Sequence, residues 1–156
     1  MNEENLQYLQ DQVLYTGFGI NHHDELKQKI GEGKPEFTIG HNSEYGTDQA
    51  SVTLNFSKSK EMDMYFFNNY HVKLSKENEK ENLEQTFYIN KGGNVTLKEA
   101  YNMMEGRSVH KELTSREGEK YNAWLQLDFK QSDEKGNFKI KQYHDFNTVG
   151  CASPLM

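Results

Sequence analysis

The sequence predicts an α+β domain made of two tandem units, each a helix followed by an antiparallel β-meander, with an additional N-terminal helix. Three observations lead to this prediction. Residues 33–71 align without a gap onto residues 106–144 when the chain is shifted by 73 positions. In both segments apolar residues alternate with polar ones, which is the period of a half-buried strand. A stretch with apolar residues at helical spacing precedes each segment.

The repeat puts residues of like character at equivalent positions. The matched pairs include Ala50 and Ala123, Leu54 and Leu127, Phe56 and Phe129, and Tyr70-His71 with Tyr143-His144. An internal repeat defines the structural unit before propensities are considered. Neither unit alone has a large core, so we expect the two to pack together and to bury the inward side chains of their middle strands. These side chains are Leu54, Phe56, Leu127 and Phe129.

Three helices are expected from apolar spacing and capping signals. The first covers residues 4 to about 15 and stops before Gly17. Asn21 is expected to cap a short second helix, which ends near Gly33. Thr96 and Glu99 have the spacing of a capping box, so a third helix is expected to begin there.

Strands and turns complete the two units. In the first unit we expect strands near residues 37–39, 50–56, 64–74 and 85–90, with a polar turn over 42–48. In the second unit we expect strands at 109–113, 121–130 and 138–143. The domain boundaries follow as 1–94 for the first part and 95–145 for the second. Residues 146–156 have no period and are expected to be a disordered tail.

Composition predicts a folded protein of the cytoplasm that does not cross a membrane. The 156 residues include 9 Tyr and 9 Phe, whereas disordered chains are poor in aromatic residues. No apolar run approaches the roughly 20 residues that span a bilayer, and the acidic N-terminus lacks the pattern of a secretion signal. The single cysteine, Cys151, permits no intrachain disulfide. The net charge of −6 disfavours nucleic-acid binding, which depends on Lys and Arg.

Three segments of the chain carry a resemblance to known sequences: DMYFFN at 63–68, EQTFYINK at 84–91 and EKYNAWLQLDFK at 119–130. They resemble a family of uncharacterised proteins encoded on conjugative and mobilisable elements of Bacteroides-type gut bacteria. The resemblance extends to about His144, and it also includes Glu-Gly-Lys-Pro at 32–35. Similar proteins continue past this point into a further helix and hairpin, so the chain resembles a shortened member. The resemblance implies an accessory protein of a mobile element and no particular reaction.

Histidines offer the first candidates for a metal site. His22, His23 and Asp24 form the densest group of possible ligands, but no third ligand lies at a helical offset, so a solvated first turn explains them better. His71 and His144 are equivalent in the repeat, and they approach each other if the two units are related by pseudo-symmetry. Structural histidines outnumber ligands in such settings. No metal and no cofactor is therefore predicted.

Other catalytic and binding patterns are weak. The loop Lys91-Gly92-Gly93-Asn94 before a helix has the form of a phosphate cradle, but it lacks the Gly-Lys-Ser/Thr ending of a P-loop. A turn followed by a capping box explains all of its residues. The only cysteine lies in the tail, and the chain contains no Gly-x-Ser-x-Gly elbow. The sequence therefore predicts no catalytic residue.

An excess of aromatic residues on the outward face is the strongest functional signal. Trp124 alternates with the inward Ala123 and Leu125 and so lies on the outer face. The repeat assigns Tyr65 and Phe67 to the core, yet the other face of the same strand is also apolar. Its residues are Met64, Phe66, Tyr70, Val72 and Leu74. Either the first helix covers this second face, or it binds a partner through Phe66, Tyr70 and Trp124.

The sequence thus favours a non-enzymatic protein-interaction module of a mobile genetic element, with an unknown protein partner. One alternative is a nucleic-acid-associated factor of plasmid mobilisation, which the resemblance suggests and the charge disfavours. The other alternative is an enzyme of unrecognised class. If Trp124 binds a partner, Trp124→Ala abolishes capture of that partner and leaves thermal stability nearly unchanged.

Overall fold

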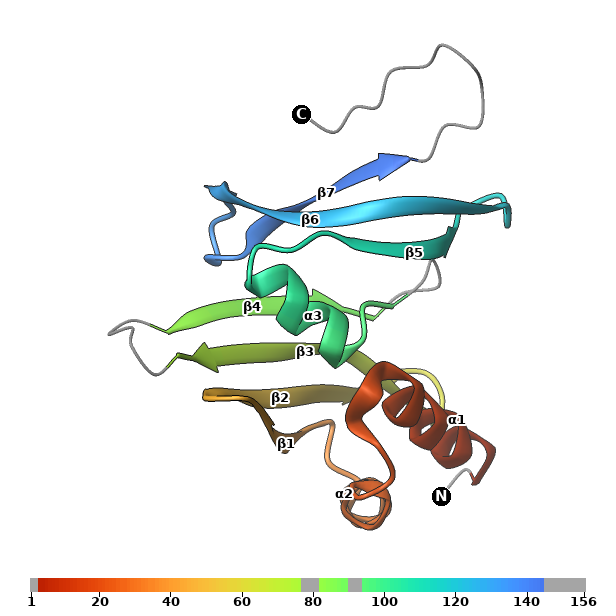
Figure 1. The fold of residues 1–156 in the computed structure, drawn as a ribbon. Coiled ribbons are helices and arrows are strands. Elements are labelled where there is room, and N and C mark those ends of the chain that lie inside the picture. Colours follow the sequence, from red (N-terminus) through yellow and green to blue (C-terminus); the bar gives the residue numbers. More distant parts are fainter. Residues whose placement is uncertain (1–2, 77–81, 90–93, 145–156) are drawn as a thin grey trace.

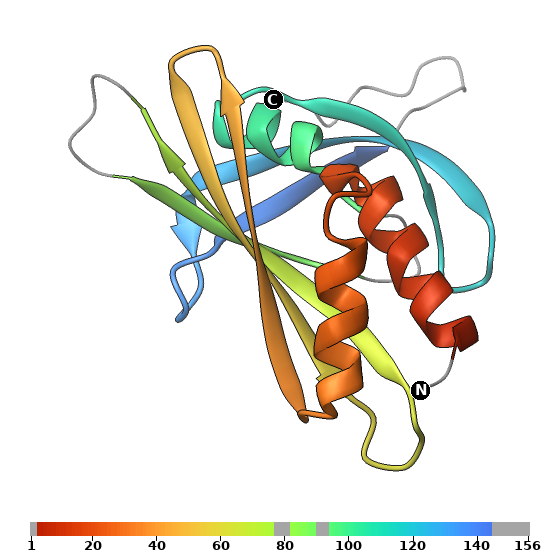
Figure 2. The same cartoon turned by 90° about the horizontal axis from the view of Figure 1, so that it is seen from below.

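Three helices and two antiparallel sheets form an α+β fold in the computed structural model (Figure 1). The structure describes residues 3–76, 82–89 and 94–144. Helix α3 lies between the two sheets, and α1 and α2 lie together over one face of the larger sheet (Figures 1 and 2). None of the helices in the described ranges is long and apolar enough to cross a membrane.

The helices begin and end close to the expected positions. Helix α1 covers Glu3–Val13 and continues into a π-helical turn, η1, at Leu14–Phe18. Helix α2 covers His23–Glu32, and α3 covers Leu97–Met104. The capping box is confirmed, because Glu99 N–H donates to the Thr96 hydroxyl at 3.2 Å and Thr96 N–H donates to the Glu99 carboxylate at 3.0 Å.

The expected cap at Asn21 is wrong. His22 is the residue that precedes α2, and its side chain makes no capping hydrogen bond. A turn in which His23 N–H donates to the Ile20 carbonyl at 3.2 Å leads into the helix, so the helix begins one residue later than a cap at Asn21 requires.

The larger sheet has the strand order β1-β2-β3-β4. Its strands are β1 (Glu36–Tyr45), β2 (Asp48–Lys58), β3 (Tyr65–Ser75) and β4 (Leu83–Tyr88). The polar turn expected over 42–48 is much shorter, because Tyr45 pairs directly with Asp48 and only two residues connect the strands. Gly46 has φ +65°, a conformation that glycine adopts without a steric penalty.

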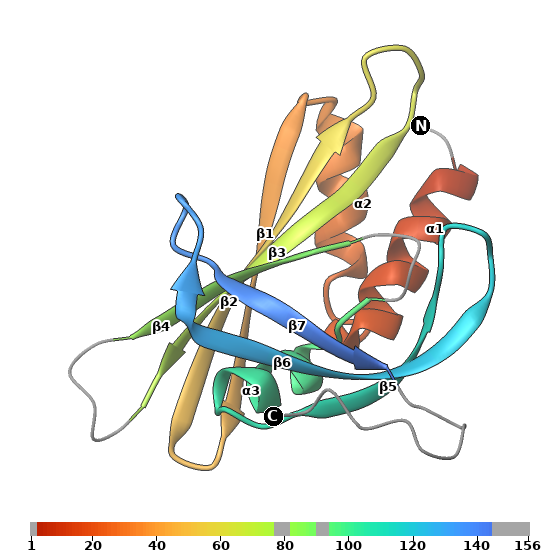
Figure 3. The ribbon, with the colours of Figure 1, turned by 90° about the horizontal axis from the view of Figure 1, so that it is seen from above.

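The smaller sheet is a three-stranded meander in the order β5-β6-β7. It consists of β5 (Val109–Thr114), β6 (Lys120–Ser132) and β7 (Phe138–His144). Its strands cross those of the larger sheet at a steep angle (Figure 3). One hydrophobic cluster includes side chains from both sheets and all three helices, as expected for two parts that share a core.

A β-bulge decides which side chains of β3 are buried. Asn55 lies opposite Asn69 and Phe56 opposite Phe67, so Asn68 is an extra residue in β3. The bulge shifts the alternation by one position, so residues on both sides of it face the same core. The buried side chains are Tyr65, Phe67, Tyr70, Val72 and Leu74. The expectation of a strand that is apolar on both faces is therefore wrong, because a single face collects nearly all of these residues.

The expected burial of Phe129 is also wrong, although Leu54, Phe56 and Leu127 are buried. The pairing of β6 with β7 jumps from Asp128–Lys139 to Ser132–Phe138. The residues between Asp128 and Ser132 leave the regular alternation, and 41% of Phe129 is exposed. Its ring packs edge-on against Phe138 with centroids 4.9 Å apart.

The tandem repeat is not confirmed in the strand pairing. Phe37 lies opposite Phe56 in the first unit, but the equivalent His110 lies opposite Trp124 and not opposite Phe129. Loop length sets the register of a hairpin, and residues 115–119 form a longer turn than the one between β1 and β2. A helix followed by three antiparallel strands occurs twice along the chain. However, the strand pairings of the two units do not match when residues are compared at the offset of 73 positions.

Candidate functional site

A groove of about 1050 Å³ lies between α1 and the first part of β3. Strand β4 pairs with β3 only from Asn69 onward. The preceding residues Met64 and 66–68 line the groove, and Lys111 of β5 lines it as well.

Three exposed aromatic side chains line this groove. The exposed fractions are 58% for Tyr8, 77% for Tyr15 and 43% for Phe66. Met64 and Ile89 add further apolar surface. Large apolar side chains that gather in one exposed concave surface are typical of binding sites, whereas isolated ones are normal on any protein.

The helix places two of these rings on one side. Tyr8 and Tyr15 are seven residues apart, which is about two helical turns. The opposite side of α1 is buried through Leu6, Leu9 and Val13. Tyr15 belongs to η1, the single π-helical turn, and single turns of this kind are frequent at functional sites.

Asn5 fixes α1 against the edge of β3. Its side-chain amide donates to the Tyr65 carbonyl at 3.0 Å and accepts from Tyr65 N–H at 2.7 Å. One buried side chain thus makes the two hydrogen bonds that a further strand would make at this position. Helix α1, which forms one side of the groove, is therefore held against the start of β3.

The charges around the groove are mainly acidic. Asp11 lies in the groove, and Glu3 and Glu4 lie in the first turn of the same helix, which contains no Lys or Arg. The Lys111 amine donates to the Glu99 carboxylate at 2.8 Å and to the Asn94 carbonyl, so its charge is compensated. A cation that enters the groove meets Asp11 without a competing positive charge on α1.

The structure separates the three partner-binding residues expected from the sequence. Phe66 lines the groove. Tyr70 is completely buried, and its hydroxyl donates to the Val95 carbonyl, so it belongs to the core and not to a binding surface. Trp124 is 37% exposed on β6, where its ring packs on His110 at 4.8 Å, away from the groove. Partner binding by Trp124 stays a prediction.

No protein-family model, curated protein or solved structure matches the chain.

Two side chains that matter for the groove were missed from the sequence. Tyr8 and Tyr15 are not among the apolar positions that predicted the first helix. The signal was available, because two aromatic residues seven positions apart stand on the otherwise polar side of that helix. The groove itself was not predictable, because its other lining residues, among them Phe66, Asn68 and Lys111, are distant from α1 in the sequence.

His71 forms two side-chain hydrogen bonds of the kind that are also found at catalytic histidines. Its Nδ1 lies 2.7 Å from the Thr86 hydroxyl and its Nε2 lies 2.9 Å from the Glu84 carboxylate. The bond from His71 lowers the pKa of Glu84. However, His71 and Thr86 are directly opposite on neighbouring strands of a polar sheet face, where such cross-strand bonds form without catalysis. The side chain of His144 lies outside the described residues.

A polar cluster connects α3 to the first hairpin. The Tyr101 hydroxyl donates to Asp48 at 2.7 Å, and the Lys76 amine bonds to the Glu105 carboxylate at 2.6 Å. The bond to Asp48 raises the pKa of Tyr101 well above its ordinary value. The rings of Tyr45 and Tyr101 are stacked with centroids 4.1 Å apart. These contacts join α3 to the first hairpin and to the end of β3.

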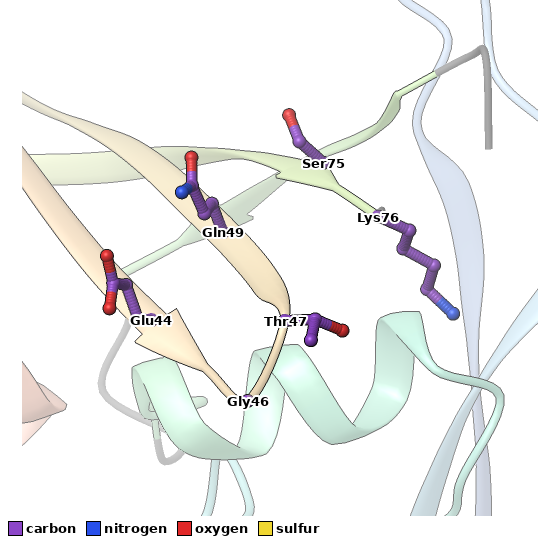
Figure 4. A pocket seen from close by; sticks show the side chains of 6 residues that line it. All are labelled: Glu44, Gly46, Thr47, Gln49, Ser75 and Lys76. Atoms are coloured by element: carbon purple, nitrogen blue, oxygen red, sulfur yellow. The ribbon is translucent and has the colours of Figure 1, made fainter. Parts of the chain in front are cut away.

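The side chains that line the pocket beside this cluster do not converge on one point (Figure 4). Its lining residues are Glu44, Gly46, Thr47, Gln49, Ser75 and Lys76. The side chain of Lys76 points away from Glu44 and Gln49, in keeping with its ion pair to Glu105 on α3 (Figure 4). Carboxylates and bases that converge on one point are required for acid–base catalysis, and this arrangement lacks that convergence.

Two of the remaining candidates from the sequence, residues 91–93 of the glycine-containing loop and Cys151, lie outside the residues that the structure describes. Among the residues that are described, no three His, Cys, Asp or Glu side chains gather as they would around a metal ion. His22, His23 and Asp24 therefore do not form a metal site by themselves.

Proposed function

We propose that the chain is a non-enzymatic protein-interaction module, an accessory protein of a mobile genetic element, and that the groove beside α1 binds its partner. The observation that carries this proposal is the convergence of Tyr8, Tyr15 and Phe66 on one concave surface. Aromatic residues are enriched among the side chains that contribute most to binding energy at interfaces. The genetic setting rests on the resemblance of residues 63–68, 84–91 and 119–130 to proteins of conjugative elements.

The chemistry of the groove favours a partner segment that is apolar and carries lysine or arginine. Tyr and Phe rings bury apolar side chains, and their faces also attract cations. Asp11 supplies a negative charge within the same groove, and the whole protein carries a net charge of −6. A basic partner is therefore attracted both over long range and in contact.

The same charges disfavour the nucleic-acid alternative. Neutralising phosphates requires several Lys or Arg side chains along one surface. Lys141 on β7 is already paired, because its amine lies 3.0 Å from the Asp128 carboxylate. The enzymatic alternative gains no support from the His71 or Tyr101 clusters described above.

The proposal is tested by affinity purification from the native host, followed by mass spectrometry, with wild type and matched variants. Tyr15→Ala and Phe66→Ala are expected to lose a partner that wild type captures. Ile20→Ala is the control, because Ile20 is 64% exposed and does not line the groove. Circular dichroism establishes that all variants keep their fold.

Two results count against the proposal. Retention of the partner by both groove variants rules out the groove. Loss of the partner in Trp124→Ala alone moves the binding surface to the outer face of the smaller sheet. Once a partner is identified, calorimetry with its interacting segment gives the affinity directly, and neutralisation of Asp11 by Asp11→Asn is expected to weaken binding to a basic segment.

A further inference from the structure

Two histidines that are distant in sequence meet at the edge of the core. His22 precedes α2, and His41 lies on β1, in line with the buried Phe37 and Ile39 on the inward face. The Nε2 atom of His22 is 2.7 Å from the Nδ1 atom of His41. The ring of Phe18 packs edge-on against His41 with centroids 5.1 Å apart, which restricts how the imidazole can rotate.

One ring nitrogen of His22 faces one ring nitrogen of His41. At 2.7 Å the two nitrogens share one proton, so one ring is the donor and the other offers its lone pair. The accepting nitrogen is therefore unprotonated, and an unprotonated imidazole nitrogen is the form that binds transition metals.

We propose that His22 and His41 form a binding site for a divalent transition-metal ion such as Zn²⁺ or Cu²⁺. Zn²⁺ is usually tetrahedral and binds imidazole nitrogen at roughly 2.0–2.1 Å, which places two such nitrogens on the order of 3.3 Å apart. The two nitrogens must therefore separate by about half an ångström. His22 lies in the turn before α2 and is only partly buried, so this side chain can make the adjustment.

Binding replaces the hydrogen bond between the two rings by two nitrogen–metal bonds. The donor ring moves its proton to its other nitrogen through solvent, and both facing nitrogens then offer lone pairs to the ion. Because no group of three or more ligand side chains exists among the described residues, water completes the coordination. Such a site leaves positions open for a ligand from another molecule. The bound ion connects the start of α2 to β1.

This inference is independent of the groove, because neither His22 nor His41 lines it. No sequence motif indicates the pair, because the second histidine comes from a strand and not from a helical offset of the first.

The test is calorimetric titration of the purified protein with CuCl₂ and with ZnCl₂ at pH 7.5. Wild type is expected to bind about one equivalent, and His22→Gln and His41→Gln each to bind at least tenfold more weakly. His110→Gln is the matched control and is expected to bind like wild type. At pH 5 binding by wild type is expected to weaken strongly, because protons compete for the same nitrogens.

Two further measurements keep the test decisive. The electron paramagnetic resonance spectrum of the Cu²⁺ complex is expected to show two nitrogen ligands, and one in either single variant. If His41→Gln does not fold, a Zn²⁺ titration of wild type followed by NMR replaces it, with shifts expected at His22, His41 and Phe18. Equal binding by the histidine variants and wild type, or no binding below millimolar ion, overturns the proposal.

Discussion

The side-chain amide of Gln85 makes both backbone hydrogen bonds that a neighbouring strand would make to Phe138. Its Nε2 donates to the Phe138 carbonyl at 3.0 Å, and Phe138 N–H donates to its Oε1 at 2.7 Å. Beside it, Thr86 N–H donates to the Asn137 side chain at 2.8 Å. The two sheets are thus joined where β7 begins, although no strand pairs across them.

Replacing this amide is expected to weaken the junction of the sheets. Gln85→Leu keeps a similar volume but leaves the N–H and C=O of Phe138 without their partners, and it should lower the free energy of unfolding by about 2–3 kcal/mol. Urea denaturation followed by circular dichroism measures the change. Gln28→Leu, on the exposed side of α2, is the control and should change stability by less than about 0.5 kcal/mol. Equal effects of the two substitutions would contradict a structural role for the Gln85 amide.

Tyr70 is expected to behave as a core residue. Tyr70→Phe removes only the hydrogen bond to the Val95 carbonyl and should cost about 1 kcal/mol. Tyr70→Ala leaves a large cavity and should cost about 3–5 kcal/mol, whereas Phe66→Ala, on a partly exposed ring, should cost much less. Thermal and urea unfolding of the three variants give this order. A stable, fully folded Tyr70→Ala variant would be incompatible with the burial described above.

The bulge at Asn68 is expected to be essential for the core. Deleting Asn68 restores regular alternation along β3, so either Tyr65 and Phe67 or the three apolar residues after the bulge must turn to solvent. Exposing two aromatic side chains costs several kcal/mol, so the deletion variant should lose cooperative unfolding. Asn68→Ala keeps the extra residue and removes only its bond to Ser57, and it should cost about 1 kcal/mol. Calorimetric scanning distinguishes the two, and a cooperative transition in the deletion variant would show that the bulge is dispensable.

Stability is expected to fall as the pH decreases from 7.5 to 5.5. The folded-state pKa of His41 lies below its unfolded value of about 6.5, because burial and His22 oppose its protonation. The unfolded chain therefore takes up a proton more readily, so the contribution of His41 is complete above pH 6.5 and is lost as the pH falls through the folded pKa.

Urea midpoints measured across this pH range test the prediction. The slope should be reduced in His41→Gln and retained in His110→Gln. Hydrogen bonds lower the pKa values of Asp48, Glu84 and Asp128, so these carboxyls titrate below the range of the measurement. An unchanged slope in His41→Gln would assign the pH dependence to another group.

Local patterns predicted most of the secondary structure. The Thr96–Glu99 capping box depends on residues three positions apart, so sequence spacing alone identifies it. The alternation of Val52, Leu54 and Phe56 likewise predicts the inward face of β2, and these three side chains are buried. Such predictions succeed because the interacting groups are neighbours along the chain.

Prediction failed where the face to which a side chain points depends on how its strand pairs with a neighbouring strand. The apolar residues of β3 occupy both phases of the alternation in sequence, and only the bulge opposite Asn55 and Phe56 brings them to one face. Tyr70 was therefore assigned to a surface that it does not reach. Phe129 was misplaced for the same reason, because the irregular pairing with β7 removes it from the core.

The sequence by itself determined the helices, the order of the strands and the α+β class, because periodicity and capping are local properties of the backbone. Only the tertiary structure decided the functional features. The groove joins Tyr8 and Tyr15 to Phe66, and the histidine pair joins a turn to a strand nineteen residues later. Contacts of this kind depend on register and on helix placement, which are set by packing of the whole core and not by spacing along the chain.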